Sequence, residues 1–206
     1  MTICIPPEVT AIVEAEIIES LHAKETFLRE CVPTLAAISM ALAERLRGGG
    51  KLLLFGNGGS AADAQHIAAE FVGRYRRERD PIAALALTVN TSVLTGVSND
   101  YGYEEVFARQ VTAFGTEKDV AIGLSTSGKS PNVLSGVAAA RQRGLLTIGW
   151  TGREGGSLRR QVDICLCVPA DATPRIQECH ILAGHVISEY CEQVRTSKEA
   201  HHVSQR

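Results

Sequence analysis

Four side chains on two predicted helical stretches have the chemistry to hold a divalent cation or to exchange a proton. His66 and Glu70 are four residues apart, which places an imidazole and a carboxylate on one face of a helix. Gln177 and His185 are eight residues apart on the last stretch, roughly 12 Å along a helix axis, so they reach one ion only if it lies between them. The spacing permits a shared site, and it is equally compatible with a surface histidine beside a carboxylate.

The other histidines and the cysteines are weaker candidates. We expect His180 to be a buried, hydrogen-bonded histidine and His201-His202 to lie in a solvated tail rather than to bind a metal. Cys165 and Cys167 alternate along a predicted strand, so their thiols should face the same way, but zinc would need two more ligands there. The cysteines are interpreted as small buried side chains in a reducing compartment; they are Cys4, Cys31, Cys165, Cys167, Cys179 and Cys191.

Two loops have the composition of anion-binding sites. The first, Gly56–Ala61, is rich in glycine and leads into a predicted helix, whose free N–H groups and dipole favour an anion. The second, Ser125–Pro131, carries four hydroxyls before another predicted helix, and Lys129 would add positive charge if it points inward. Together the loops predict a phosphate site for a small molecule. The alternative is a pair of turns that merely cap helices.

The first loop also fits the dinucleotide pattern G-x-G-x-x-A, but the companion of that pattern is missing. A dinucleotide site usually has an acidic residue about 20 positions further on, at the end of the second strand. Here the second strand ends in Thr88-Val89-Asn90. No Gly-Lys-Ser/Thr follows the glycines either, which excludes a nucleotide-triphosphate loop.

The elements that must position these groups alternate between strands and helices. This alternation predicts an α/β fold with a doubly wound, flavodoxin-like parallel sheet of five strands, in which ligands bind beyond the carboxyl ends of the strands. Short apolar runs predict strands at Lys51–Phe55, Ala83–Val89, Val120–Leu124, Leu145–Trp150 and Ile164–Val168. Helices are predicted at about Ala61–Phe71, Thr91–Ser98, Tyr103–Phe114, Pro131–Arg143 and Pro174–Arg195.

The chain begins with extra helices and is expected to end in a tail. One helix starts at Pro6-Pro7-Glu8, and a second runs from about Thr34 to Leu46 and is stopped by Gly48-Gly49-Gly50. We expect residues 1–48 to form oligomer contacts or to cap the sheet. A single domain should cover residues 1–195, and residues 196–206 should form a flexible tail.

Composition limits the class of protein. The 206 residues are 45% hydrophobic and 21% charged with a net charge of −2, which is typical of one globular domain and excludes both wholesale disorder and a basic nucleic-acid-binding surface. No apolar run is expected to reach the ~18–20 residues that span a bilayer. Residues 1–15 lack the positive start of a signal peptide. We therefore expect a cytoplasmic protein with no nucleic-acid or membrane partner.

Four motifs occur in order between Leu52 and about Glu192: Gly56–His66, Ser98–Gly102, Ser125–Ser130 and Arg175–His180. They resemble the phosphoheptose isomerase family, within the sugar-isomerase (SIS) domain fold. The resemblance implies an aldose–ketose isomerase that converts D-sedoheptulose 7-phosphate to D-glycero-D-manno-heptose 7-phosphate. That reaction is the first step towards nucleotide-activated heptose, of which lipopolysaccharide is one destination.

The resemblance also implies a ligand set and an assembly. Zinc, one ion per subunit, would be bound by His66, Glu70, Gln177 and His185. The substrate would be held by Asn57, Gly58, Gly59, Ser60, Glu70, Asn99, Asp100, Ser125, Thr126, Ser127, Ser130 and Gln177. The family is similar in forming homotetramers with active sites near subunit interfaces. This chain departs from the family at Lys129, where asparagine is usual, and at Asn90, where an acidic or hydroxyl residue is more frequent.

Isomerisation of this kind moves a proton between C1 and C2 of the sugar through an enediol, which needs a base, an acid and nearby positive charge. We expect Glu70 to be the base and His185 its acid partner, with zinc polarising the carbonyl. The main alternative is a non-catalytic relative that binds a replication-initiator protein. That branch loses the equivalents of Glu70 and His185, and this chain keeps both. A sugar-phosphate sensor would carry a helix-turn-helix domain, for which we expect no room.

Overall fold

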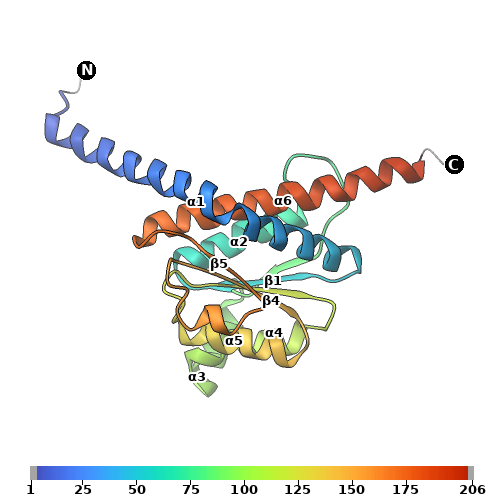
Figure 1. The fold of residues 1–206 in the computed structure, drawn as a ribbon. Coiled ribbons are helices and arrows are strands. Elements are labelled where there is room, and N and C mark those ends of the chain that lie inside the picture. Colours follow the sequence, from blue (N-terminus) through green and yellow to red (C-terminus); the bar gives the residue numbers. More distant parts are fainter. Residues whose placement is uncertain (1–3, 204–206) are drawn as a thin grey trace.

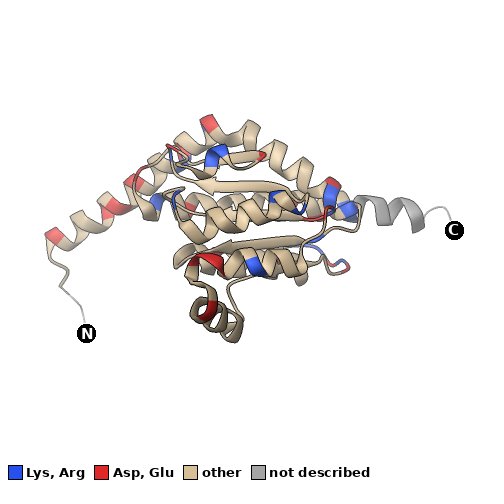
Figure 2. Ribbon diagram, turned by 90° about the horizontal axis from the view of Figure 1, so that it is seen from below, with Lys and Arg blue, Asp and Glu red and all other residues tan. Residues whose placement is uncertain are grey.

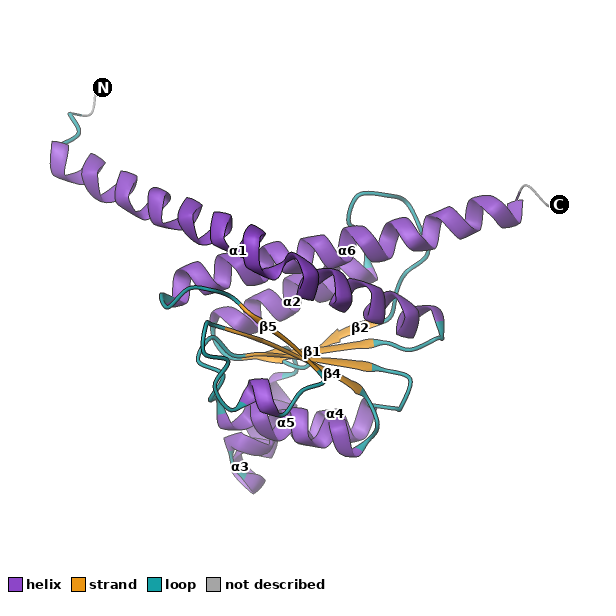
Figure 3. Ribbon diagram, in the orientation of Figure 1, coloured by secondary structure: helices purple, strands orange, loops and turns teal. Residues whose placement is uncertain are grey.

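The computed structural model describes the backbone of residues 4–203 and the side chains of residues 4–195. Within that range a five-stranded sheet forms in the order β2-β1-β3-β4-β5, and every neighbouring pair is parallel. This confirms the predicted doubly wound α/β fold (Figures 1 and 3). The strands are β1 (Leu52–Gly56), β2 (Ala84–Ala86), β3 (Val120–Leu124), β4 (Leu146–Thr151) and β5 (Ile164–Cys167).

The apolar runs become strands because both faces of the sheet are covered. All residues of β1 and β3 are buried, and the two strands pair from Leu52–Val120 to Gly56–Leu124. β2 is shorter than predicted because its ladder ends at Leu54–Ala86 and the chain then turns away from this edge.

Helices pack on both faces of the sheet (Figure 1). One core cluster joins the sheet to α1, α2 and α6 and includes Phe71 and Trp150; the other joins it to α4 and α5 and includes Phe55 and Phe107. The helices are α1 (Pro7–Arg47), α2 (Gly59–Val72), α3 (Thr91–Tyr101), α4 (Val106–Phe114), α5 (Pro131–Gln142) and α6 (Thr173–Val203). Single 3-10 turns lie at Tyr103–Glu105 and Leu158–Arg160.

The N-terminal region is one helix, so the prediction of two separate helices is wrong. α1 runs unbroken through Pro33. A proline removes one hydrogen bond and crowds the preceding turn, which usually ends a helix. Here Cys31 and Leu35, on either side of the proline, are both buried in the core, and this packing holds the helix together.

The C-terminal helix also runs further than predicted. α6 continues to Val203 rather than ending at Arg195, so most of the expected tail is helical backbone. The side chains of His201 and His202 lie outside the described set, as does the chain beyond residue 203.

The expectation that no apolar stretch is long enough to span a bilayer is wrong for α1, which contains an 18-residue window with a mean hydropathy of 1.3. By length and composition alone it could cross a membrane, although 39% of that window is buried inside the protein. Its N-terminal half projects beyond the body of the molecule (Figure 1). Apolar side chains on this half are exposed: Val9, Ile12, Val13, Ile17, Ile18 and Leu21.

The charges on the described residues are mixed in sign. Figure 2 shows basic and acidic residues on both helical layers, with acidic residues along the N-terminal half of α1. This distribution agrees with a net charge close to zero.

Candidate active site

Both predicted anion loops lie at the carboxyl end of the sheet, after the neighbouring strands β1 and β3. β1 and β3 are neighbours, but the chain leaves β1 towards β2 and leaves β3 towards β4. Such a topological switch point leaves a crevice at the carboxyl ends of the two strands, where ligands bind in open α/β sheets. The first loop, Gly56–Ala61 before α2, is called the glycine loop, and the second, Ser125–Pro131 before α5, the serine loop; the two flank this point.

A cluster of three metal-ligating side chains forms between α2 and α6. His66 Nε2 lies 3.0 Å from His185 Nε2 and 3.2 Å from Glu70 Oε1. One ligand atom from each residue lies within 4.8 Å of the other two. The structure therefore brings three of the four predicted ligands to one place, from helices far apart in the sequence.

The donor set of this cluster suits zinc. Two imidazole nitrogens and a carboxylate oxygen are ordinary zinc ligands, and they leave a coordination position open. Ligands at about 2.0–2.1 Å from a tetrahedral zinc ion lie about 3.3 Å from one another. The His66 contacts of 3.0 and 3.2 Å are close to that separation.

Close packing of α2 against α6 makes this cluster possible. Gly184 lies over Ile67, and a Cβ atom at Gly184 would be 2.5 Å from Ile67 Cγ1. Because glycine has no side chain, the helix backbones approach closely here, and the next residue, His185, comes opposite His66. The sequence gives no sign that Gly184 has this role.

The fourth predicted ligand, Gln177, is on α6, and its side chain packs against the start of α2. Its Nε2 atom is 2.1 Å from where a Cβ of Gly59 would be, so its amide fills the space that the missing side chain leaves. Gly59 is seven residues before His66 on α2. The structure thus joins Gln177 to the glycine loop, while its part in metal binding stays a prediction.

An amide pair joins the two loops. Asn57 Nδ2 donates to Asn132 Oδ1 and Asn132 Nδ2 donates to Asn57 Oδ1, both at 2.8 Å. The Tyr103 hydroxyl also donates to Asn57 Oδ1, at 3.4 Å. Asn132 is buried at the start of α5 and is not among the residues predicted from the sequence. Its place directly after Ser130-Pro131 was the signal that could have identified it.

The remaining residues of the glycine loop have distinct environments. Gly58 has φ of +54°, in the left-handed region that favours glycine, and it caps α2. Ser60 is buried, with its Cβ against Gly56. Gly58 and Gly59 are exposed and leave their backbone accessible at the helix N-terminus.

The serine loop is held by its own hydroxyls and by a neighbouring loop. Ser125 Oγ lies 2.9 Å from Ser130 Oγ and 3.4 Å from Ser127 Oγ. The Thr126 carbonyl accepts a 2.9 Å hydrogen bond from Gly152 N. These contacts gather three hydroxyls at the N-terminus of α5, as a phosphate cradle requires. Lys129 is exposed.

Asn99 and Asp100 lie on α3, which has no buried residue among those described. Asn99 Nδ2 donates to Asp100 Oδ1 at 2.8 Å, and both side chains are exposed. No described contact joins either residue to the two loops or to the metal-ligating cluster. Asn90, noted for its departure from the family, caps α3 by accepting a 3.1 Å hydrogen bond from Val93 N.

Tyr75 and Glu192 support the cluster and were not predicted. The Tyr75 ring stacks on the His185 imidazole, with centroids 5.5 Å apart. The Glu192 carboxylate is fully buried and accepts hydrogen bonds from the backbone N–H of Tyr75, Arg76 and Arg77 at 2.7–3.0 Å. Arg79 Nε lies 3.3 Å from the same carboxylate. Glu192 therefore fixes the chain segment that carries Tyr75.

One buried and one partly buried titratable group, His180 and Asp63, have shifted pKa values. His180 is fully buried, as expected, and burial lowers its pKa to about 4, so it is neutral at pH 7. Its Nε2 lies 3.4 Å from the Thr151 carbonyl, while Nδ1 has no described partner. On α2, burial raises the pKa of Asp63 to about 6.

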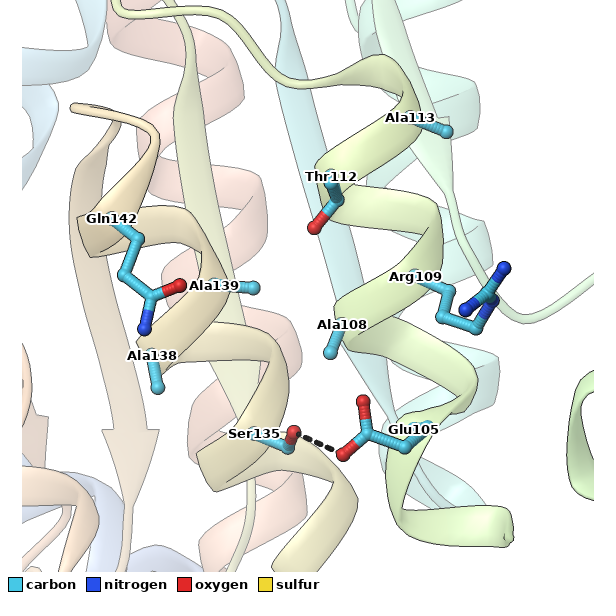
Figure 4. Close-up of a pocket in the computed structure, with 9 residues that line it drawn as sticks. All are labelled: Glu105, Ala108, Arg109, Thr112, Ala113, Ser135, Ala138, Ala139 and Gln142. Atoms are coloured by element: carbon cyan, nitrogen blue, oxygen red, sulfur yellow. Dashed lines mark hydrogen bonds between the residues drawn. The ribbon is translucent and has the colours of Figure 1, made fainter. Parts of the chain in front are cut away.

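A separate cavity of about 550 Å³ lies between α4 and α5. Figure 4 shows small side chains lining it, with Ala139 of α5 directed towards α4 and Ala108, and with Ser135 donating to Glu105 at 3.2 Å at one end. None of the predicted site residues lines it, so we do not assign it to the active site.

Comparisons with known proteins agree on one family. The SIS domain family model matches residues 18–152. The phosphoheptose isomerase of Roseiflexus sp. (strain RS-1) is 55% identical over 178 residues, which are 86% of this chain and 90% of the relative. The structure of phosphoheptose isomerase GmhA from Neisseria gonorrhoeae superposes with a TM-score of 0.85 at 41% identity, covering 90% of this chain and 99% of that one. A phosphoheptose isomerase structure from Francisella tularensis gives 0.87 at 35% identity, covering 90% and 98%.

Proposed function

This chain belongs to the phosphoheptose isomerases of the SIS domain family, and we propose that it converts D-sedoheptulose 7-phosphate to D-glycero-D-manno-heptose 7-phosphate. The observation that carries the proposal is that His66 and Glu70 of α2 meet His185 of α6. The glycine loop leads directly into α2. A base, an acid and an anion site are what an aldose–ketose isomerase of a sugar phosphate needs.

We propose that the serine loop binds the phosphate. Ser125, Ser127 and Ser130 gather their hydroxyls at the N-terminus of α5, where backbone N–H groups and the helix dipole favour an anion. The backbone of Gly58 and Gly59 is exposed and available to the sugar, and the Gln177 amide beside Gly59 would face the same ligand. Holding the substrate at its phosphate fixes the reacting carbons and lowers the entropic part of the barrier.

Proton transfer is assigned to the two helices. Glu70 takes the proton from C1 of the ketose while His185 donates a proton to the C2 carbonyl oxygen. Glu70 then returns a proton to C2, and His185 takes the proton from the C1 hydroxyl, which leaves the aldehyde at C1. A carboxylate has two oxygens, so one can remain at the cluster while the other accepts the proton. A positioned base or acid contributes typically ~10²–10⁴-fold to the rate.

The proposed cofactor is one zinc ion per subunit, held by His66, Glu70 and His185, with Gln177 as the fourth ligand. When bound, zinc supplies Lewis-acid stabilisation of the negative oxygen of the enediol. The distances within the cluster support this assignment, since the two histidines and the carboxylate already face one another at near-coordination separations.

Glu70 and Gln177 are also assigned to substrate binding, with Asn57, Ser60, Thr126, Asn99 and Asp100.

We further propose a homotetramer in the cytoplasm. The exposed apolar side chains on the N-terminal half of α1 support an interface with other subunits, since a lone helix does not leave such a surface in water without cost. A groove of about 490 Å³ between α1 and α6, lined by Phe27, Val32 and Val186, continues that surface. The cysteines of the described chain are unpaired, which suits a reducing compartment.

A coupled assay on sedoheptulose 7-phosphate, with and without a chelator, tests the function. We expect turnover that disappears after chelation and returns with zinc. Glu70→Gln and His185→Ala should each reduce kcat by at least ~10²-fold while the far-ultraviolet circular dichroism stays unchanged. Turnover near wild type in either variant would overturn the proposed roles. Binding of a replication-initiator protein, with no turnover by the wild type, would favour the non-catalytic alternative.

A further inference from the structure

The Cys-x-Cys motif is not used by the proposed reaction, yet the structure joins its two thiols. Cys165 and Cys167 lie on β5, the edge strand of the sheet, and their side chains point the same way, as the alternation predicted. Their Sγ atoms are 3.6 Å apart and hydrogen-bonded to each other. Both residues are only partly buried.

We propose that Cys165 and Cys167 form a peroxide-sensitive dithiol, with Cys167 attacking the peroxide and Cys165 resolving the product to a disulfide. Two partly buried thiols at this separation are the arrangement from which a sulfenic acid is captured by a neighbouring cysteine. The oxidant is hydrogen peroxide or an organic hydroperoxide.

The chemistry balances in two steps. The Cys167 thiolate attacks one peroxide oxygen, which forms an S–O bond and breaks the O–O bond, so that Cys167 becomes a sulfenic acid and hydroxide leaves. The Cys165 sulfur then attacks the sulfenic sulfur, forms the S–S bond and releases water. In total two thiols lose two electrons and two protons; hydrogen peroxide is reduced to two molecules of water, and an organic hydroperoxide to an alcohol and water.

The surroundings assign different roles to the two sulfurs. The hydrogen bond with Cys165, helped by the nearby Arg159 guanidinium, lowers the pKa of Cys167 to about 7, whereas the pKa of Cys165 is raised by its hydrogen bond with Cys167 and by burial. At neutral pH Cys167 is therefore the more readily ionised of the two sulfurs and the one we assign to attack, while Cys165 keeps its proton.

The strand geometry makes the product reversible. Cys165 pairs across the sheet with Gly149, and its sulfur lies 3.6 Å from that of Cys167 on the same face of the strand. Neighbouring same-face positions of an extended strand are nevertheless far apart for a disulfide, so bond formation must bend the strand. An edge strand has one free side and can bend, and a strained disulfide is readily reduced by thiols.

The other cysteines of the chain serve as internal controls. Burial raises the pKa of Cys31 to about 11, that of Cys191 to about 12, and that of Cys179 in the same direction, so these thiols should not react. Cys4 is exposed and is the ordinary thiol for comparison.

The test treats the full chain, as purified and loaded with zinc, with a small excess of hydrogen peroxide. Free thiols are then alkylated in denaturant, and peptides are analysed by mass spectrometry. We expect a Cys165–Cys167 disulfide that dithiothreitol reverses. Loss of the Cys167 thiol should be about threefold faster than loss of the Cys4 thiol at pH 7, because a larger thiolate fraction is partly offset by lower nucleophilicity.

Two serine variants separate the roles. Cys165→Ser should leave Cys167 as a persistent sulfenic acid that dimedone captures, and Cys167→Ser should leave Cys165 as an unreacted thiol. Cys4→Ser should not change either result. Oxidation of Cys167 no faster than Cys4, absence of the disulfide, or dimedone capture at Cys165 in Cys167→Ser would each overturn the proposal. Both variants are small isosteric changes, and unchanged circular dichroism and zinc content show that they fold.

Discussion

The Tyr75 ring lies over the His185 imidazole, with the ring planes 22° apart and the centroids separated by 5.5 Å. Tyr75 follows α2, which carries His66 and Glu70, while His185 belongs to α6. Tyr75, in the segment that follows α2, therefore supports His185 of α6. Stacking restricts rotation of the imidazole and keeps its Nε2 towards His66.

Removing the ring should loosen the cluster. We expect Tyr75→Ala to weaken zinc binding about tenfold, as changes around metal ligands commonly do, whereas Tyr75→Phe should stay close to wild type because the stacking face is kept. Competition with a chromophoric chelator measures the zinc affinity without relying on turnover. Equal affinities for Tyr75→Ala and wild type would show that His185 needs no brace.

Glu192 should be among the most costly polar residues to replace. Burial would raise the pKa of Glu192, but hydrogen bonds from the backbone N–H groups of Arg76, Tyr75 and Arg77, together with Arg79, outweigh it and hold the pKa below its usual value. Glu192→Gln leaves the Arg79 guanidinium without its charged partner, and we expect a loss of about 3 kcal/mol in the free energy of unfolding.

The pH dependence of this loss has a definite sign. A carboxylate with a lowered pKa in the folded state contributes stability above its unfolded pKa of about 4.3, and the contribution disappears as the pH falls through the folded value. Urea unfolding at pH 7 and at acidic pH should show the difference between Glu192→Gln and wild type shrinking with acidification. Glu78→Gln, whose side chain is 91% exposed, should have little effect at either pH.

The amide pair between the two loops should matter for substrate binding and for stability. Asn132→Ala removes both hydrogen bonds to Asn57, and we expect it to cost about 1–3 kcal/mol of stability. Without its partner the Asn57 amide can turn, so the KM for sedoheptulose 7-phosphate should rise more than kcat falls. Ser135→Ala, on the same helix but outside the site, is the control and should leave KM unchanged.

The contact between Gly184 and Ile67 should govern how closely α2 and α6 approach. A Cβ at Gly184 would be 2.5 Å from Ile67 Cγ1, so Gly184→Ala must push the helices apart, at an expected cost of about 1–3 kcal/mol. Zinc affinity should fall in parallel. At Gly96 no atom lies within 4 Å of the added Cβ, and Gly96→Ala on α3 should not weaken zinc binding. Unchanged zinc affinity in Gly184→Ala would separate the helix spacing from the cluster.

Charges on the exposed face of α1 should dissociate the proposed tetramer. Ile12 and Ile17 are 65% and 55% exposed in a single chain, and we expect the double variant Ile12→Glu/Ile17→Glu to lower the mass measured by light scattering. Phe114→Glu, at a residue 49% exposed at the end of α4, provides a matched control. A tetramer that survives the α1 substitutions would place the interface elsewhere.

Local pattern predicted most of the fold. The apolar runs of β1 and β3, the glycine loop and the Ser-rich loop before Pro131 are short-range signals, and each reflects a local requirement of backbone conformation or burial. The same local signals misplaced the helix boundaries. Pro33 suggested a break in α1, but packing against the core decided otherwise, because burial on both sides of the proline outweighs one lost hydrogen bond.

By itself the sequence determined the kinds of chemistry present: imidazole and carboxylate four residues apart, two anion loops, and a Cys-x-Cys motif. Only the tertiary structure decided which groups meet. It placed His185 beside His66 and packed the Gln177 amide against Gly59. It also showed that Asn132 pairs with Asn57 and that Glu192 holds the segment of Tyr75. The reason is physical: spacing along one helix is set by its own geometry, whereas contact between helices depends on packing across the whole core, such as the approach that Gly184 permits.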